Sequence, residues 1–368
     1  MNELSVIASH SQNNLIHHPD FAHGFHLLNH FYSQLLARIY FISTDSLFIG
    51  SLFSVLMWAI SAMVLIQTLH LLEVEKSGQF KAMAIYSLLP SSILFTGVTL
   101  REPFQLLLVN LATFSALKVY LNKSVKFALL LPALVFVMKK FHLSLFVLGL
   151  FIISSLLILL IIRKWGTYSI IKGIFISSLI VLTAYLVLPR IGLSNFVPSE
   201  KGLPSAINRY LSVGVSYGAR TQYLHNIEIN GMIDLLLFMP KHFFQYLFEP
   251  MPWRVSTALD IIILLENLLR AALIWKVLTG IYHKQTQKMR ITLFVFISYL
   301  VFEAVWSSGT VNWGTAMRHH VPAMGLLIAA AFAYSKERQK YIYSNPPKKI
   351  EAGIGFRTHI NTDPDYPR

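Results

Sequence analysis

Five cationic side chains in this sequence are candidates for binding one anion. They are Arg101, Lys139, Arg220, Arg254 and Arg318, and His319 directly follows the last of them. Arginine binds phosphate or carboxylate through two parallel hydrogen bonds, whereas lysine acts as a compact point charge. A ring of such groups favours an anionic ligand such as a pyrophosphate. The alternative is that each cation contacts a phospholipid headgroup by itself.

Two carboxylates are candidates for a general base. Asp20 lies in the segment HHPDFAHGF, and Glu102 directly follows Arg101 in PSSILFTGVTLREPF. Transfer of a sugar to a hydroxyl group requires a base, which is commonly Asp or Glu. Glu102 could instead pair with Arg101 and only orient its guanidinium. The sequence favours neither role over the other.

The sequence predicts no metal site and no nucleotide site. His319 and His320 are adjacent and would not converge on one ion in a helix, and no carboxylate stands at ligand spacing from them. Walker A, Rossmann and zinc-helix motifs are absent. The chain has no cysteine, which excludes disulfides and thiolate ligands. A divalent cation such as Mg²⁺ that bridges phosphates would need few protein ligands and is compatible with the anion site.

The composition indicates an all-α integral membrane protein. The chain is 55% hydrophobic and only 13% charged, whereas a soluble domain carries roughly 25% charged residues. Several of the predicted spans are shorter than the ~20 residues that a crossing helix needs, notably 125–138 and 321–334. The nine predicted spans are 47–72, 82–98, 104–121, 125–138, 143–162, 168–188, 257–278, 291–306 and 321–334.

The distribution of Lys and Arg predicts the orientation of the chain. These residues concentrate after the first, third, fifth, seventh and ninth spans, which places those loops in the cytoplasm and predicts N-out/C-in topology. The net charge of +14 therefore does not require a nucleic-acid partner. The predicted parts are an outer N-terminal segment (1–46), spans one to six (47–188), an outer loop with interfacial helices (189–256), spans seven to nine (257–334) and a disordered cytoplasmic tail (335–368).

Two charged residues lie inside predicted spans. Arg270 belongs to the seventh span and Glu303 to the eighth. A lone buried charge is costly, and removing one partner of a buried pair leaves the other uncompensated. We therefore expect Arg270 and Glu303 to pair across the two helices as a structural link.

Three segments carry a resemblance to a known group of proteins: PSSILFTGVTLREPF (90–104), LFEPMPWRVS (247–256) and NWGTAMRHHVPAMGLL (312–327). In this order they resemble bacterial multi-spanning proteins of polysaccharide gene clusters, the C-type membrane glycosyltransferases and the O-antigen or exopolysaccharide polymerases. The resemblance implies inverting glycosyl transfer from a polyprenyl-pyrophosphate-linked sugar at the outer face of the bacterial cytoplasmic membrane. It implies that Arg101, Arg220 and Arg318 hold the pyrophosphate. C-type enzymes carry an acidic motif after a first span; here Asp20 alone takes that place, and we expect a shortened relative.

Three functional hypotheses remain open on the sequence. The first is a glycosyltransferase or polysaccharide polymerase whose ligands are a lipid-linked saccharide and membrane lipid. The second is a flippase or transporter of a lipid-linked sugar, which usually has an internal repeat and polar or broken helices at mid-membrane; no repeat is visible. The third is a non-catalytic membrane partner within a polysaccharide assembly system, in which case the arginines could be replaced without loss of function.

Overall fold

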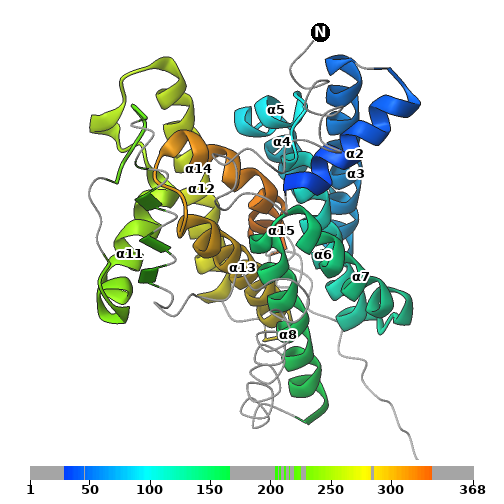
Figure 1. The fold of residues 1–368 in the computed structure, drawn as a ribbon. Helices are drawn as coiled ribbons and strands as arrows, with labels where there is room; N and C mark the ends of the chain where they lie inside the picture. The colour runs from blue at the N-terminus through cyan, green and yellow to red at the C-terminus, as the bar shows by residue number, and fades with distance from the viewer. Residues whose placement is uncertain are drawn as a thin grey trace, which may run out of the picture. The chain divides into compact units, whose positions relative to one another are not determined.

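Helices account for all the regular secondary structure in the part of the chain that the computed structural model describes (Figure 1). That part comprises residues 29–44, 46–165, 229–282 and 286–333, together with 204, 205, 207, 208, 211, 212, 215 and 219–224. All of it belongs to one compact unit, Met1–Tyr334. The only pairing of extended backbone in these residues is an antiparallel bridge between Gln222 and Asn312. The predicted all-α class is confirmed for the described residues.

Four of the helices are long and apolar enough to cross a membrane, which supports the predicted membrane class. They are α3, α6, most of α8 and most of α13. The count of nine spans and the N-out/C-in topology stay predictions, and the predicted span 168–188 and the tail lie outside the described residues. The helices are α2 (Asn29–Ile42), α3 (Leu47–Leu71), α4 (Lys76–Leu88), α5 (Pro90–Thr96), α6 (Glu102–Asn122), α7 (Val125–Phe141), α8 (Leu143–Trp165), α11 (Met232–Phe248), η6 (Pro252–Arg254), α12 (Ala258–Tyr282), α13 (Thr286–Ser307), α14 (Trp313–His320), η7 (Val321–Ala323) and α15 (Met324–Ala333).

The predicted second span, 82–98, is wrong as a single helix. Helix α4 ends at Leu88 and the short helix α5 starts at Pro90, with Leu89 in a non-helical conformation at φ −59° and ψ 122°. Proline has no backbone N–H and disfavours the helical conformation of the residue before it, which explains the break. The 13 residues of α4 extend ~20 Å, less than the ~30 Å of a hydrocarbon core.

The predicted ninth span, 321–334, contains a helix that is even shorter than α4. It forms the 3₁₀ turn η7 followed by α15, and all ten residues of α15 are buried inside the protein. Helix α15 packs against α3, α4, α6, α12 and α13. Helix α15, although uniformly apolar, therefore lies at the centre of a helical bundle and does not face lipid.

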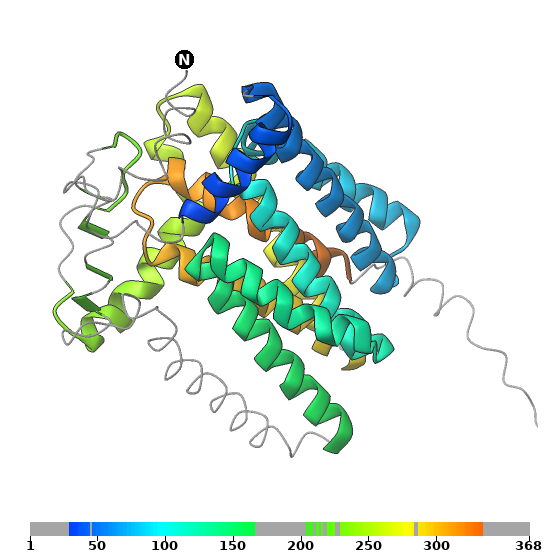
Figure 2. The ribbon, with the colours of Figure 1, turned by 45° about the vertical axis from the view of Figure 1, so that its right-hand side comes forward.

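Helix α6 organises the part of the bundle that carries the candidate residues. It packs against α3, α7 and α8, and the two views show α3, α6 and α7 side by side (Figures 1 and 2). The rings of Phe104 and Phe141 stack with centroids 5.8 Å apart, so the beginning of α6 meets the end of α7. His142 and Trp306 stack at 4.2 Å, which brings the end of α13 to the same place. The loops after the second, fourth and eighth predicted spans, which the predicted topology places at the outer face, thus meet at one end of the bundle.

The expected link between Arg270 and Glu303 is wrong. Arg270 donates from Nη1 to the carbonyl oxygen of Leu247, at 2.8 Å, and to the side chain of Asn267. Glu303 Oε2 lies 2.7 Å from Nδ1 of His320. Each charge therefore has its own local partners, and the described chain contains no ion pair between the two.

Helix α11 covers the interrupted apolar stretch that the sequence predicts to be interfacial. It runs without a break through Pro240. Met232, Ile233, Leu236 and Leu237 are more than half exposed along its first two turns. A helix with an exposed apolar face next to polar residues is typical of an interfacial segment, so that prediction remains consistent with the described residues.

A buried polar cluster joins α3, α4 and α6. Asn110 Nδ2 donates to Ser61 Oγ at 2.8 Å and to the Tyr86 hydroxyl at 3.3 Å, and the two hydroxyls lie 3.0 Å apart. On its other side Asn110 touches the backbone of Gly325 in α15. A Cβ built at Gly325 would overlap the amide of Asn110.

Replacing Gly325 by alanine is therefore expected to destabilise the fold by about 1–3 kcal/mol, the usual cost of overpacking a core. Asn110 cannot move away cheaply because Ser61 and Tyr86 hold its amide. Thermal unfolding of the purified protein in detergent checks this, with Gly231→Ala as the control because a Cβ there meets nothing within 4 Å. Equal unfolding temperatures for the two variants would contradict the prediction.

Candidate functional site

Glu102 is the centre of the candidate site. It stands in the first turn of α6, directly after Arg101 and before Pro103. The N-terminus of a helix stabilises a negative charge, and proline is favoured in the first turn because its missing N–H would have no helical partner there. The Glu102 side chain is only 2% exposed, so its carboxylate needs compensating charge.

Two guanidinium groups supply that charge. Arg318 donates from Nε to Glu102 Oε1 at 2.6 Å, and Arg101 Nε lies 3.7 Å from the same oxygen. Two cations and one carboxylate leave a net charge of +1. The other oxygen, Glu102 Oε2, is buried and has no hydrogen-bond partner in the described residues. Both roles that the sequence left open for Glu102, proton acceptor and orienting ion pair, remain compatible with this geometry.

The terminal amino groups of the Arg318 guanidinium have no hydrogen-bond partner among the described residues. Arg318 lies in the last turn of α14, a short helix capped at its start by Asn312, whose Oδ1 accepts from Thr315 N at 2.8 Å. The Arg318 side chain is 34% exposed. Its Nε is engaged by Glu102, while Nη1 and Nη2 make no hydrogen bond to any residue that the structure describes. A guanidinium held at Nε with open terminal amino groups suits bidentate binding of a phosphate.

Arg101 reinforces this positive site. Burial lowers the pKa of its guanidinium; Glu102 opposes that shift, and the neighbouring charge of Arg318 adds to it. An anion placed beside both arginines would reduce their mutual repulsion. The site therefore favours a negatively charged ligand on electrostatic grounds.

Two histidines and a tryptophan lie beside the arginines. The ring of His142 stacks on Trp306 with centroids 4.2 Å apart, and the ring of His319 lies tilted against it at 4.1 Å. Burial and the charge of Arg101 lower the pKa of His142 to about 3. Burial also lowers the pKa of His319 well below its ordinary value, and His142, Arg101, Arg318 and His320 act in the same direction. Both imidazoles are therefore neutral at physiological pH.

Arg220 and Arg254 belong to a second cluster, at the start of α14. Arg220 binds Asp260 with both terminal nitrogens, at 2.8 and 3.1 Å, and Arg254 Nη1 lies 2.9 Å from Glu249 Oε1. Trp313 joins the two pairs: its Nε1 donates to Asp260 Oδ1 at 2.9 Å, and the Arg254 guanidinium lies 5.5 Å from its ring. Both guanidiniums therefore anchor α14, and their predicted role as anion ligands stays a prediction.

The remaining predicted residues are not brought to Glu102 by any described contact. Lys139 is partly exposed near the end of α7 and makes no ion pair with a carboxylate in the described chain. Asp20 lies outside the described residues. Of the eight predicted site residues, the structure thus joins Arg101, Glu102, Arg318 and His319 in one cluster and Arg220 with Arg254 in a second.

Three members of the first cluster were not predicted as site residues: His142, Trp306 and Thr310. Thr310 Oγ1 lies 2.9 Å from His319 Nδ1. His142 lies in the short loop between the fourth and fifth predicted spans, which the predicted topology places at the outer face, and its position there was a usable signal. Nothing local marks Trp306 or Thr310, because their role depends on contacts between α8, α13 and α14.

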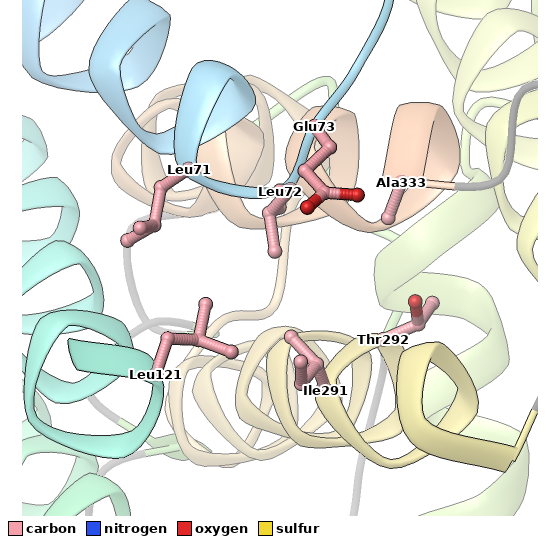
Figure 3. Close-up of a pocket in the computed structure, with 7 residues that line it drawn as sticks. All are labelled: Leu71, Leu72, Glu73, Leu121, Ile291, Thr292 and Ala333. Carbon is pink, nitrogen blue, oxygen red and sulfur yellow. The ribbon is translucent and has the colours of Figure 1, made fainter. Parts of the chain in front are cut away.

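A pocket of about 160 Å³ lies at the other end of α6 (Figure 3). Its lining residues are Leu71, Leu72, Glu73, Leu121, Ile291, Thr292 and Ala333. Leu121 belongs to the last turn of α6, whereas Glu102 begins that helix. The pocket has no cationic lining residue and is separate from the Glu102 cluster.

Comparison with known proteins does not identify a family for this chain. No family model, no curated protein and no solved structure matches the chain. Among the described residues no three His, Asp or Glu side chains are grouped as metal ligands. The side chains of the two clusters are therefore the basis for inferring the function.

Proposed function

We propose that this protein is a multi-pass enzyme of the bacterial cytoplasmic membrane that acts in surface-polysaccharide biosynthesis. It transfers or polymerises sugars from a polyprenyl-(pyro)phosphate-linked donor at the outer face. The observation that carries this proposal is the geometry of Arg318, which is anchored at Nε by buried Glu102 and open at its terminal amino groups, next to Arg101.

The chemistry of such a transfer matches a site of this charge. The bond between the anomeric carbon and the phosphate oxygen breaks, and negative charge develops on the departing phosphate. Cations that are already in position stabilise this charge without reorganising during the reaction. Arg101 and Arg318 are held by a common carboxylate, so their guanidiniums are preorganised.

Of the two roles left open for Glu102, this proposal favours the orienting ion pair over the proton acceptor. Protonating its carboxylate would remove the charge that holds Arg318 and Arg101 together. Its ion pairs therefore favour the orienting role, in which Glu102 fixes both guanidiniums toward the donor. The proton acceptor must then be sought among the neighbouring side chains.

A flippase of a lipid-linked sugar is the second candidate, and the break between α4 and α5 favours it, because transporters often bind substrate at broken helices. The positions of the charges favour the enzyme. The Glu102 cluster lies at one end of the bundle, whereas a flippase needs polar groups along a path through it. The third candidate, a non-catalytic partner in an assembly system, predicts that the arginines can be replaced without effect.

The experiment is a gel of surface polysaccharide from a strain that lacks this gene and carries wild type, Arg101→Ala or Arg290→Ala at matched expression. Arg290 is a partly exposed arginine at the opposite end of α13 and serves as the control. We expect Arg101→Ala to lose long polysaccharide chains, because the departing phosphate loses one of its two cations, while Arg290→Ala resembles wild type.

The pattern of loss separates the candidates. Loss of long chains with single repeats still displayed supports a polymerase that uses Arg101. Loss of every form supports a transferase or a flippase that acts earlier, and a transfer assay with the purified protein then distinguishes the two. An unchanged ladder in Arg101→Ala would exclude this residue from the site and favour the non-catalytic partner.

A further inference from the structure

The hydroxyl of Thr310 determines which nitrogen of His319 carries a proton. Thr310 Oγ1 donates to the carbonyl oxygen of Trp306 at 2.8 Å and lies 2.9 Å from His319 Nδ1. A hydroxyl group has one proton and two lone pairs. Because its proton is directed to the carbonyl, Oγ1 must accept a hydrogen bond from His319. Nδ1 of His319 is therefore protonated, and Nε2 of the neutral ring carries a lone pair.

His142 has the opposite tautomer. Its Nδ1 lies 3.1 Å from the backbone N–H of Ser144 and accepts a hydrogen bond from it. An accepting nitrogen carries no proton, so the proton of the neutral ring is on Nε2. The low pKa of His142 keeps this ring neutral, and its Nε2–H is a fixed donor.

The two rings thus offer complementary groups beside the same indole ring. Both pack against Trp306 and both are partly exposed. Neither Nε2 makes a hydrogen bond within the described residues. The site therefore holds one open acceptor nitrogen and one open donor nitrogen beside Arg101 and Arg318, whose charges act on His319.

We propose that His319 Nε2 takes the proton of the attacking sugar hydroxyl and that His142 Nε2–H donates a hydrogen bond to a phosphate oxygen of the donor. This assignment depends on the proposed function. The acceptor oxygen forms a bond to the anomeric carbon while its proton moves to His319 Nε2. The bond from that carbon to the phosphate oxygen breaks, and its electron pair leaves with the phosphate, which faces the two arginines. The imidazolium then releases its proton to water.

The bound donor makes His319 a better base. In the free site the positive charges of Arg101 and Arg318 disfavour a third cation, the protonated ring. A pyrophosphate that binds those arginines offsets their charge, so protonation of His319 becomes less costly. The pKa of His319 should therefore rise when pyrophosphate binds, and the base becomes effective only in the loaded enzyme.

The tautomers can be tested without any enzymatic activity. Protein labelled with ¹⁵N-histidine is examined by NMR, and signals are assigned with His142→Gln and His319→Gln. We expect a protonated Nδ1 in His319 and a protonated Nε2 in His142. Addition of inorganic pyrophosphate should raise the pKa of His319 toward its ordinary value. The same tautomer in both rings, or a His319 pKa that pyrophosphate leaves unchanged, would overturn the proposal.

Catalysis is tested with the full chain in lipid nanodiscs and a polyprenyl-pyrophosphate-linked saccharide as donor. We expect His319→Gln to lower kcat by about 10²–10⁴-fold, the usual contribution of a general base, with pyrophosphate binding retained. His70→Gln, an exposed histidine at the end of α3, should behave as wild type. Thr310→Val should lower kcat and alter its pH profile, because His319 loses the acceptor that fixes its tautomer, and Thr310→Ser should restore both.

The outcomes separate this proposal from the proposed function. If the wild-type protein transfers sugar and His319→Gln retains full kcat, the assignment of His319 as the base is wrong. The proposed function is not affected by that result. A wild-type protein that neither binds pyrophosphate nor transfers sugar overturns the proposed function, and the base assignment with it. Failure of Thr310→Ser to rescue Thr310→Val would show that the hydroxyl does not position His319.

Discussion

Under the proposed function, replacing Arg318 by alanine is expected to lower sugar transfer by about 10²–10³-fold, the usual effect of removing one preorganised donor from developing negative charge. Arg318 is the cation whose terminal amino groups are open while its Nε is fixed by Glu102. The loss should fall on kcat more than on KM, because the charge on the departing phosphate is largest in the transition state. The measurement is transfer by purified protein in nanodiscs.

Arg318→Lys gives the sharper comparison. Lysine restores the positive charge but has a single ammonium group, which cannot bind Glu102 and offer two parallel donors to a phosphate at the same time. We expect an activity between that of wild type and Arg318→Ala. Arg290→Ala controls for the general effect of removing an arginine. Full activity in Arg318→Ala, with folding verified by its unfolding temperature, would exclude this residue from the reaction.

Replacing Asp260 by alanine is expected to give the largest loss of stability, about 3 kcal/mol, near the lower end of the cost of breaking a buried ion pair. The Asp260 side chain is fully buried and accepts from Arg220 at 2.8 Å, from Trp313 Nε1 at 2.9 Å and from Thr257 N at 3.0 Å. Its removal leaves Trp313 Nε1 and the Thr257 N–H without this acceptor, while Arg220 keeps its hydrogen bond to Ser256 Oγ. We take the lower end of the range for breaking a buried ion pair because half of the Arg220 side chain is exposed and can be rehydrated.

Unfolding of the purified protein in detergent measures this loss. Asp260→Asn should cost less, since an amide oxygen can still accept from Trp313. Asp234 provides a matched control, because it is an exposed carboxylate in the first turn of another helix, α11, and replacing it should cost no more than about 1 kcal/mol. Equal stability of Asp260→Ala and Asp234→Ala would show that the second cluster does not anchor α14.

Two groups of properties follow from the sequence by itself. Apolar composition and the length of the apolar runs are sufficient to predict a helical membrane protein, because the cost of unpaired backbone groups in lipid leaves few alternatives to a helix. Charge is the other local signal. Arg101, Glu102, Arg318 and His319 are recognisable as candidates because ionisable residues beside membrane spans are rare and costly.

Only the tertiary structure decides which of these residues meet. Glu102 and Arg318 are 216 positions apart, and no local pattern specifies their contact. The same applies to Glu303, which pairs with His320 and not with Arg270. Helix α15 has a sequence as apolar as a lipid-facing span, yet neighbouring helices bury it completely. Hydrophobicity reports that a side chain avoids water, whereas the arrangement of helices determines whether lipid or protein covers it.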